Sequence, residues 1–157
     1  MLYIGDLVNT HGIKGEVRIN SLFKYKDIVF QKNNFIYIND EKLMIVSHRV
    51  HKGYNMVKFD GYEDINDVLK FKGCKVYILK DDYVFPGIIN EELYGRNVYV
   101  DDEVIGTLKE IVNNNGQELF VVQGVKKYLI PNVSEFVKDI NERGIYINAI
   151  KGLIDEN

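Results

Sequence analysis

The chain of 157 residues has few of the features that would set it apart from ordinary globular proteins. Its single cysteine, Cys74, excludes an internal disulfide and a thiolate metal cage. No run of about eighteen apolar residues occurs, so we expect no membrane-spanning helix. Residues 1–6 lack the basic and apolar regions that open a signal peptide. These absences predict a cytoplasmic protein in a reducing compartment, with no membrane contact.

The charge is nearly balanced overall but is distributed unevenly along the chain. The formal net charge is -3. Residues 1–81 hold 13 Lys and Arg against 10 Asp and Glu, whereas residues 82–157 hold 7 against 13. The asymmetry suggests two modules with different partners: phosphate for the first and a basic protein for the second. Chance is the alternative, because an excess of three positive charges is small for a nucleic-acid domain.

Alternating apolar and polar residues predict short strands in the first half. In residues 16–20, Val17 and Ile19 are expected to face a core and Arg18 to face outward. Residues 63–69 break the alternation with helical spacing of apolar side chains. The expected strands are 2–8, 16–20, 35–38, 43–46, 54–59 and 74–79. Six strands and one short helix indicate a small barrel as a first domain, residues 1–81.

The second half repeats this pattern after a linker, residues 82–92, which contains Pro86 and Gly87. The apolar residues of the linker are expected to dock on one of the domains. Asn115-Gly116 is typical of a type I′ hairpin turn. The expected strands are 97–100, 104–108, 119–122, 128–130, 136–140 and 145–147. The sequence thus predicts an all-β protein of two small barrels in tandem, the second spanning residues 93–157.

No motif supports catalysis or a bound cofactor. His11 follows Thr10 but has no recognisable nucleophile motif beside it. His48 and His51 are three residues apart in an extended run, so their side chains point to opposite faces and cannot easily coordinate one metal ion together. Residues 12–15 lack the spacing of a phosphate loop. We therefore predict a non-enzyme without cofactor or metal, in which His11, Lys14 and Arg18 cluster near one end of the first barrel and can approach phosphate.

Motifs along nearly the whole chain have a specific order and spacing. They occupy residues 5, 11–18, 57–61, 73–78, 92–95, 106, 115–122, 129–131, 136–140 and 152–153. In these motifs, above all His11-Gly12-x-x-Gly15-Glu16, the sequence resembles the RimM family of bacterial ribosome maturation factors. The resemblance implies a six-stranded barrel like the second domain of elongation factors, followed by a PRC barrel.

The resemblance also implies a function and contact residues. The family assists assembly of the small-subunit head: it binds small-subunit ribosomal protein number nineteen and the immature small subunit, and helps rRNA maturation without being a nuclease. A tyrosine pair tied to ribosome binding usually precedes the Asp-Leu-Ile-Gly motif. This chain has Ile88-Ile89 there, and Glu92-Leu93-Tyr94-Gly95 as the motif. The implied ribosomal-protein contact is therefore Ile88, Ile89, Leu93 and Tyr94. For the rRNA or ribosome contact we predict the cluster already described, His11, Lys14 and Arg18.

Two other interpretations stay open at the level of sequence. One is a translation-factor-like accessory, which nucleotide binding by the purified protein would support. The other is a PRC-type scaffold for a different partner, which pull-down from lysate would separate from a ribosomal one. We expect a monomer in each case.

Overall fold

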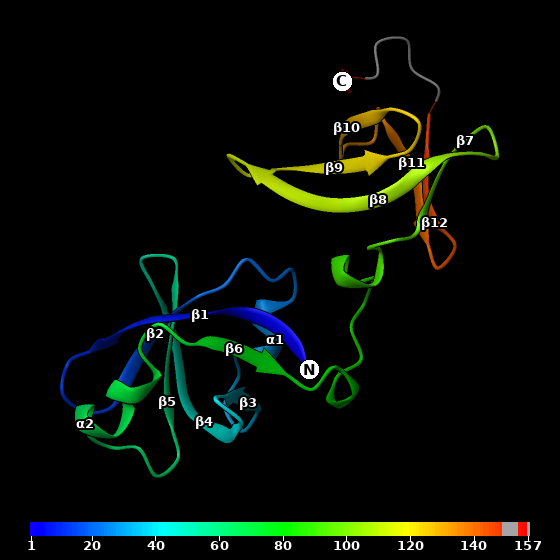
Figure 1. The fold of residues 1–157 in the computed structure, drawn as a ribbon. Coiled ribbons are helices and arrows are strands. Elements are labelled where there is room, and N and C mark those ends of the chain that lie inside the picture. The colour runs from blue at the N-terminus through cyan, green and yellow to red at the C-terminus, as the bar shows by residue number, and fades with distance from the viewer. Residues whose placement is uncertain (149–153, 157) are drawn as a thin grey trace. The chain divides into compact units, whose positions relative to one another are not determined.

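The computed structural model describes residues 1–148 and 154–156. It divides into two compact units, Met1–Val84 and Phe85–Asn157. Strands dominate both units and the helices are short (Figure 1). No helix in the described residues has the length and apolar character to cross a membrane. The predicted all-β architecture of two tandem β modules is confirmed.

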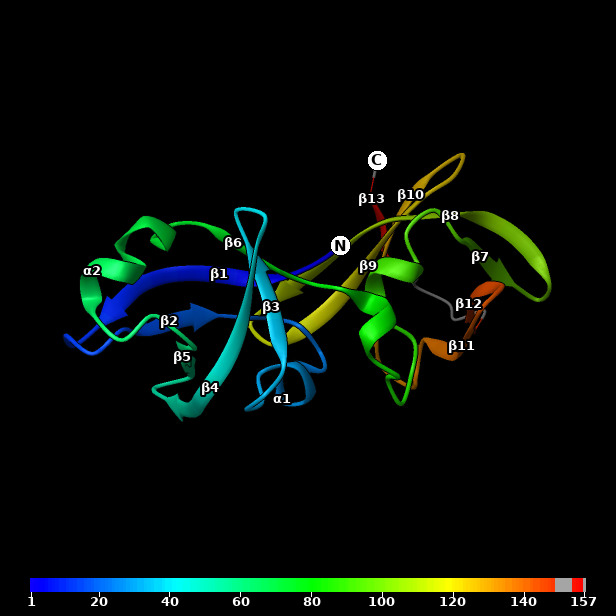
Figure 2. The same ribbon diagram turned by 90° about the horizontal axis from the view of Figure 1, so that it is seen from below.

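The first unit is a closed six-stranded barrel with the strand order β1-β2-β5-β4-β3-β6 (Figure 2). The strands are β1 (Leu2–His11), β2 (Glu16–Asn20), β3 (Phe35–Ile38), β4 (Glu41–His51), β5 (Tyr54–Phe59) and β6 (Lys75–Ile78). The long strand β1 closes the barrel, because it pairs with β2 along one edge and with β6 along the other. All six predicted strands are present, while the sequence did not predict the short helix α1 (Lys26–Val29).

The alternation of residue types places the core of this barrel as expected. Val17 and Ile19 are fully buried, and Arg18 between them lies on the outer surface. The predicted helix is present as α2 (Ile65–Val68), followed by the 3-10 turn η1 (Leu69–Phe71). A capping box stabilises the N-terminus of α2: the Asp64 carboxylate accepts a hydrogen bond from the backbone amide of Asn66.

The second unit is a seven-stranded sheet with the order β11-β12-β7-β8-β9-β10-β13. The strands are β7 (Asn97–Val100), β8 (Glu103–Asn114), β9 (Gln117–Gln123), β10 (Lys127–Pro131), β11 (Val137–Asn141), β12 (Gly144–Ile147) and β13 (Ile154–Glu156). Asn115 and Gly116 have φ of 52° and 87°, as a type I′ turn requires. The sequence did not predict β13. The sheet encloses a core that includes Leu108, Phe120 and Ile145.

The segment between β6 and β7 contains two 3-10 turns, η2 (Lys80–Asp82) and η3 (Asn90–Glu92). The boundary between the units follows Val84 and therefore falls within residues 82–92. Ile88 packs against the core of the second unit, in line with the expected docking. Val84 is 97% exposed, so the expectation that all apolar linker residues dock is wrong for this one.

Candidate functional site

The turn between β1 and β2 presents Lys14 at one end of the first barrel. Gly15 has a φ of +85°, and a Cβ atom there would lie 2.2 Å from the Tyr62 carbonyl oxygen. The backbone amide of Ile65 donates to the Ile13 carbonyl at 2.9 Å. The turn is thus held against the residues that start α2, while the side chains of Ile13 and Lys14 point to solvent.

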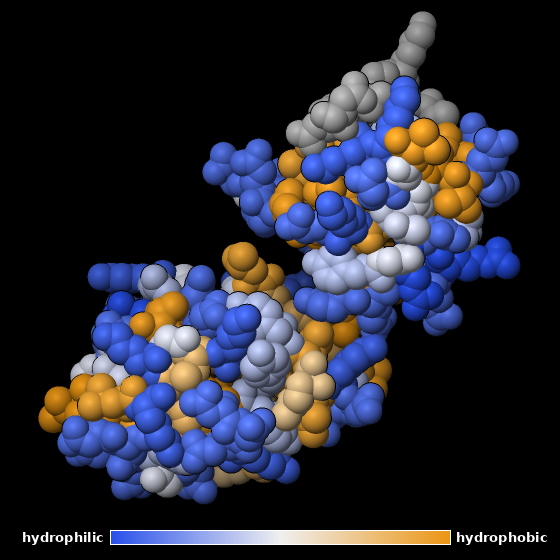
Figure 3. Space-filling model, viewed as in Figure 1, coloured by the Kyte–Doolittle hydropathy of each residue, from blue (hydrophilic) through white to orange (hydrophobic). Residues whose placement is uncertain are grey.

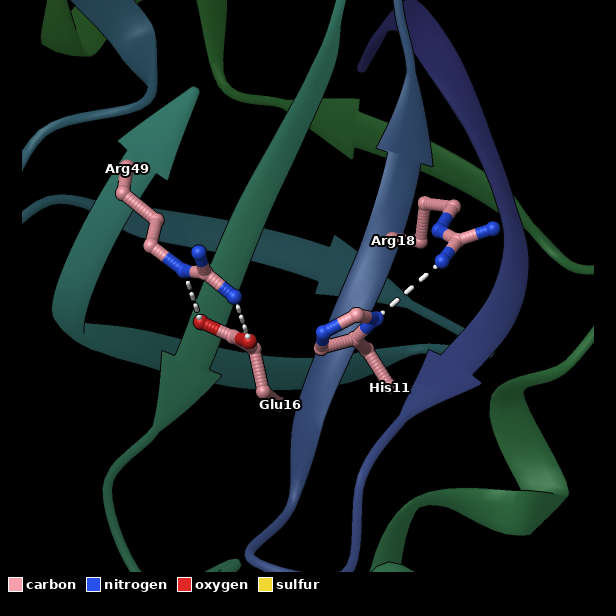
Figure 4. Close-up of polar contacts among 4 residues, drawn as sticks. All are labelled: His11, Glu16, Arg18 and Arg49. Atoms are coloured by element: carbon pink, nitrogen blue, oxygen red, sulfur yellow. Dashed lines mark hydrogen bonds and ion pairs between the residues drawn. The ribbon is translucent and has the colours of Figure 1, made fainter. Parts of the chain in front are cut away.

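The side chains of His11 on β1 and Arg18 on β2 meet on the outer surface of the barrel (Figure 4). The Arg18 guanidinium lies 3.1 Å from His11 Nδ1. Because arginine can only donate, Nδ1 must accept, which assigns the proton of neutral His11 to Nε2. The guanidinium also lies over the Tyr54 ring, 5.2 Å from its centroid. Two of the three predicted phosphate-contact residues are therefore in direct contact.

The carboxylate of Glu16 is engaged by a neighbouring arginine. Arg49 on β4 donates from Nε and from its terminal nitrogen at 3.0 and 2.8 Å, a bidentate pair (Figure 4). These hydrogen bonds lower the pKa of Glu16. Arg18, by contrast, forms no salt bridge within the described residues, and its Nε is buried without a hydrogen-bond partner there. Arg18 is thus a positioned cation with unused donors.

The two histidines of β4 diverge, as the strand geometry predicts. His48 Nε2 lies 2.9 Å from Asn55 Oδ1, and its ring stacks on buried Phe30. The His51 ring lies 5.8 Å from that of His11. Partial burial, followed by the charge of Arg49, lowers the pKa of His51. No group of three metal-ligating side chains occurs in the described part of the chain. His11 and His51 lie beside cations, whereas His48 contacts a neutral amide and an aromatic ring.

Sequence reasoning missed four contributors to this face: Arg49, His51, Tyr54 and Lys58. They lie on β4 and β5. The pairing of these two strands places Tyr54 opposite His51, and the pairing of β5 with β2 places Met56 opposite Arg18. The alternation within 54–59 could have indicated that Lys58 faces outward, but not which residues it joins. We call this set, with His11, Lys14, Glu16 and Arg18, the cationic face of the first barrel.

The four residues expected to contact a ribosomal protein have different environments. Leu93 is 3% exposed and belongs to the core of the second unit, so little of its side chain is available to a partner. Ile89 is also buried, at 2%. Ile88 is partly buried against the same core. Tyr94 is 46% exposed and is the most accessible of the four to a partner.

Carboxylates surround Tyr94. Burial, followed by the charge of Glu91, raises the pKa of its hydroxyl, and Glu110 and Glu118 act in the same direction. The Glu118 carboxylate accepts from the side-chain amides of Asn90 at 2.8 Å and Asn132 at 3.0 Å. Since amides are neutral, they fix this carboxylate in place without cancelling its charge. The surroundings of Tyr94 are therefore acidic.

The fold and these surfaces define a tandem β protein with a cationic face on the first unit and an acidic environment on the second. Residues 2–83 match the family model described as the RimM N-terminal domain. The chain is 35% identical to the ribosome maturation factor RimM of Staphylococcus haemolyticus, over 97% of this chain and 98% of that protein. It is 36% identical to that of Staphylococcus aureus, with the same coverage. The chain belongs to the RimM family.

Two solved structures of RimM proteins are similar to this chain. A RimM crystal structure from Pseudomonas aeruginosa is 19% identical, with a TM-score of 0.47, over 94% of this chain and 96% of that one. The solution structure of the N-terminal domain of RimM from Thermus thermophilus is 16% identical, with a TM-score of 0.46, over 55% of this chain and 96% of that one.

Proposed function

We propose that this protein is a non-enzymatic factor in the cytoplasmic maturation of the small ribosomal subunit. Its first barrel contacts rRNA of the immature subunit through His11, Lys14 and Arg18. Its second unit contacts small-subunit ribosomal protein number nineteen. Similarity over nearly the full length to proteins named ribosome maturation factors supports the general role.

The main support for the rRNA contact is the environment of the Arg18 guanidinium. Its guanidinium is oriented by His11 and Tyr54 but is not neutralised by a carboxylate among the described residues. A planar guanidinium with free donors suits a phosphate group. Glu16, the nearby carboxylate, is occupied by Arg49 and competes little for it.

The second contact is argued from the acidic surroundings of Tyr94. An exposed tyrosine offers an apolar ring and a polar end, a combination common at the centres of protein interfaces. The carboxylates of Glu91, Glu110 and Glu118 favour a basic partner, and ribosomal proteins that contact rRNA need basic surfaces. Ile88 can add apolar contact at its exposed edge.

Co-sedimentation with immature small subunits tests the rRNA contact. We expect the double variant Lys14→Glu/Arg18→Glu to bind at least about tenfold more weakly at low salt, because two phosphate contacts become repulsive. The matched control is Lys32→Glu/Lys72→Glu, which reverses two exposed lysines of the same unit outside the cationic face. Thermal melts establish that both variants stay folded. Equal co-sedimentation of the two variants would show that the cationic face is not the contact.

The protein contact is tested in the same preparation with purified ribosomal protein nineteen. Tyr94→Ala is expected to weaken this binding, since it removes an exposed ring from an otherwise acidic surface. Val104→Ala, which truncates another exposed side chain of the second unit, serves as the control. Undiminished binding by Tyr94→Ala would refute the assignment of the second contact.

A further inference from the structure

Two hollows flank a pair of lysines at the end of the first barrel. The first has a volume of about 380 Å³ and is lined in part by Ile13 and Glu16. The second has a volume of about 430 Å³ and is lined in part by Val46, Asp60 and Glu63. Lys14 and Lys58 line both hollows. The two depressions are therefore neighbours that share a cationic border.

Each hollow combines an apolar wall with a carboxylate. In the first, the Ile13 side chain is 73% exposed, and Figure 3 shows an apolar patch at the end of this unit where the β1–β2 turn lies. In the second, Val46 is partly exposed beside Asp60 and Glu63. Volumes near the lower end of the range of small-molecule sites, about 300–1,000 Å³, suit one flat heterocycle each. The apolar wall can pack against the face of the ring, and the carboxylate can accept a hydrogen bond from a donor on the ring's edge.

The shared lysines are free to bind an anion. Neither Lys14 nor Lys58 forms a salt bridge among the residues that the structure describes. Lys14 comes from the β1–β2 turn and Lys58 from the outer face of β5, so the border between the hollows receives two ammonium groups from separate elements. A phosphate lying across this border would meet both.

We propose that the two hollows take two successive unpaired nucleotides of RNA, one base in each, with the linking phosphate on Lys14 and Lys58. The proposal rests on the proposed rRNA contact and specifies its substrate as single-stranded. Bases within a duplex are stacked and paired and cannot enter such hollows, whereas splayed bases of loops can. The lysine pair beside the unpaired carboxylates Asp60 and Glu63 matches a strand whose phosphate is anionic and whose base donates hydrogen bonds. An acidic peptide fits less well, because Asp60 and Glu63 would repel its side chains.

The carboxylates also predict a base preference. Carboxylates accept hydrogen bonds from the exocyclic amine of cytosine, which uracil lacks. Asp60 and Glu63 in the second hollow have no salt-bridge partner among the described residues, unlike Glu16. We therefore expect cytidine-rich strands to bind more tightly than uridine-rich strands of equal length.

Fluorescence anisotropy with short RNAs tests the proposal on the full chain. The probes are seven-nucleotide oligocytidine and oligouridine and a fully paired RNA duplex of the same length. We expect the oligocytidine to bind about tenfold or more tightly than the duplex. Lys58→Gln should weaken this binding several-fold and reduce the slope of log affinity against log salt by about 0.7, the loss of one phosphate contact on a single strand.

Two more variants address the walls of the hollows. Ile13→Ser removes the exposed apolar wall of the first hollow and should weaken oligocytidine binding about fourfold, because contact equivalent to about one methylene group is lost. Asp60→Asn should reduce the ratio of oligocytidine to oligouridine affinity while raising both, since it removes a negative charge. Lys72→Gln, at an exposed lysine that lines neither hollow, is the matched control and should change nothing.

The outcomes separate this proposal from the proposed function. Equal binding of duplex and single strand, a Lys58→Gln variant that behaves like Lys72→Gln, or equally tight binding of an oligoglutamate peptide would overturn the single-strand site. If any of these occurs while Lys14→Glu/Arg18→Glu still loses immature subunits, the rRNA contact stands and only the hollows are wrong. If oligocytidine binds as expected but the unchanged protein does not co-sediment with immature subunits, the proposed function fails instead.

Discussion

The two glycines of the β1–β2 turn allow a matched test of how the first barrel supports Lys14. Gly12 and Gly15 have similar left-handed φ values, +71° and +85°. A Cβ added to Gly12 meets nothing within 4 Å, whereas one added to Gly15 would lie 2.2 Å from the carbonyl oxygen of Tyr62. Alanine at either position therefore has the same backbone strain, and only Gly15→Ala adds a collision.

These contacts determine how much folding stability each variant loses. Left-handed strain costs about 1 kcal/mol, of which the reduced freedom of the unfolded chain offsets about 0.5 kcal/mol. Gly12→Ala should therefore destabilise by about 0.5 kcal/mol. For Gly15→Ala, the Tyr62 carbonyl must retreat by about 1 Å to reach an ordinary C···O contact. That movement disturbs the hydrogen bond from Ile65 to Ile13, which adds about 1–3 kcal/mol and brings the total to about 1.5–3.5 kcal/mol.

Scanning calorimetry on the full chain measures both effects. For a unit of this size we expect the melting temperature to fall by about 3 °C in Gly12→Ala and by about 15 °C in Gly15→Ala. The transition of the second unit is an internal control, because neither substitution touches it. Equal shifts in the two variants, or a Gly15→Ala shift below about 3 °C, would refute the argument that the contact with Tyr62 determines the turn.

Two further predictions concern the same unit. Asp64→Ala removes the capping box of α2 and should lower the free energy of unfolding by about 1 kcal/mol, which urea denaturation measures. Backbone amides of α2 and the adjoining turn should exchange hydrogen faster, and those elsewhere should not. Unchanged exchange would argue against the cap. The hydrogen bond from the Tyr3 hydroxyl to Asp6 is the main cause that raises the Tyr3 pKa to about 12. Because that pKa exceeds its unfolded value of about 10, the contribution is complete below pH 10 and is lost as the pH rises from 10 to 12. The stability advantage of the unchanged protein over Tyr3→Phe should shrink across that interval, and a constant difference would contradict the assignment.

Strand positions could be predicted from alternation, but strand ends could not. The sequence predicts a strand at 104–108, whereas β8 continues to Asn114. The pairing of β8 with β9 shifts between Leu108 and Glu110, and β4 shifts in the same way between Ile45 and Ser47. Such bulges insert a residue and reverse the alternation, so a period-2 pattern stops there although the strand goes on.

The candidate site was predictable only where its residues are close in sequence. His11, Lys14 and Arg18 belong to one hairpin, whose turn fixes their separation. Arg49 and Lys58 come from β4 and β5, and their place beside that hairpin depends on pairing registers that one sequence does not specify. The burial of Leu93 could not be predicted either, since a family motif does not show which of its apolar residues belong to the core.

The salt bridges within each unit, more than its total charge, determine which charges remain available to a partner. On the first barrel, Glu16 is paired with Arg49 and Glu41 with Lys70, so each pair removes one charge of either sign. The positive excess is left with cations such as Arg18, which has no salt bridge among the described residues. In the second unit, Glu118 is held by two neutral amides and keeps its charge. A sequence total near zero therefore conceals two surfaces of opposite sign, as a factor that handles phosphate with one unit and a basic protein with the other would require.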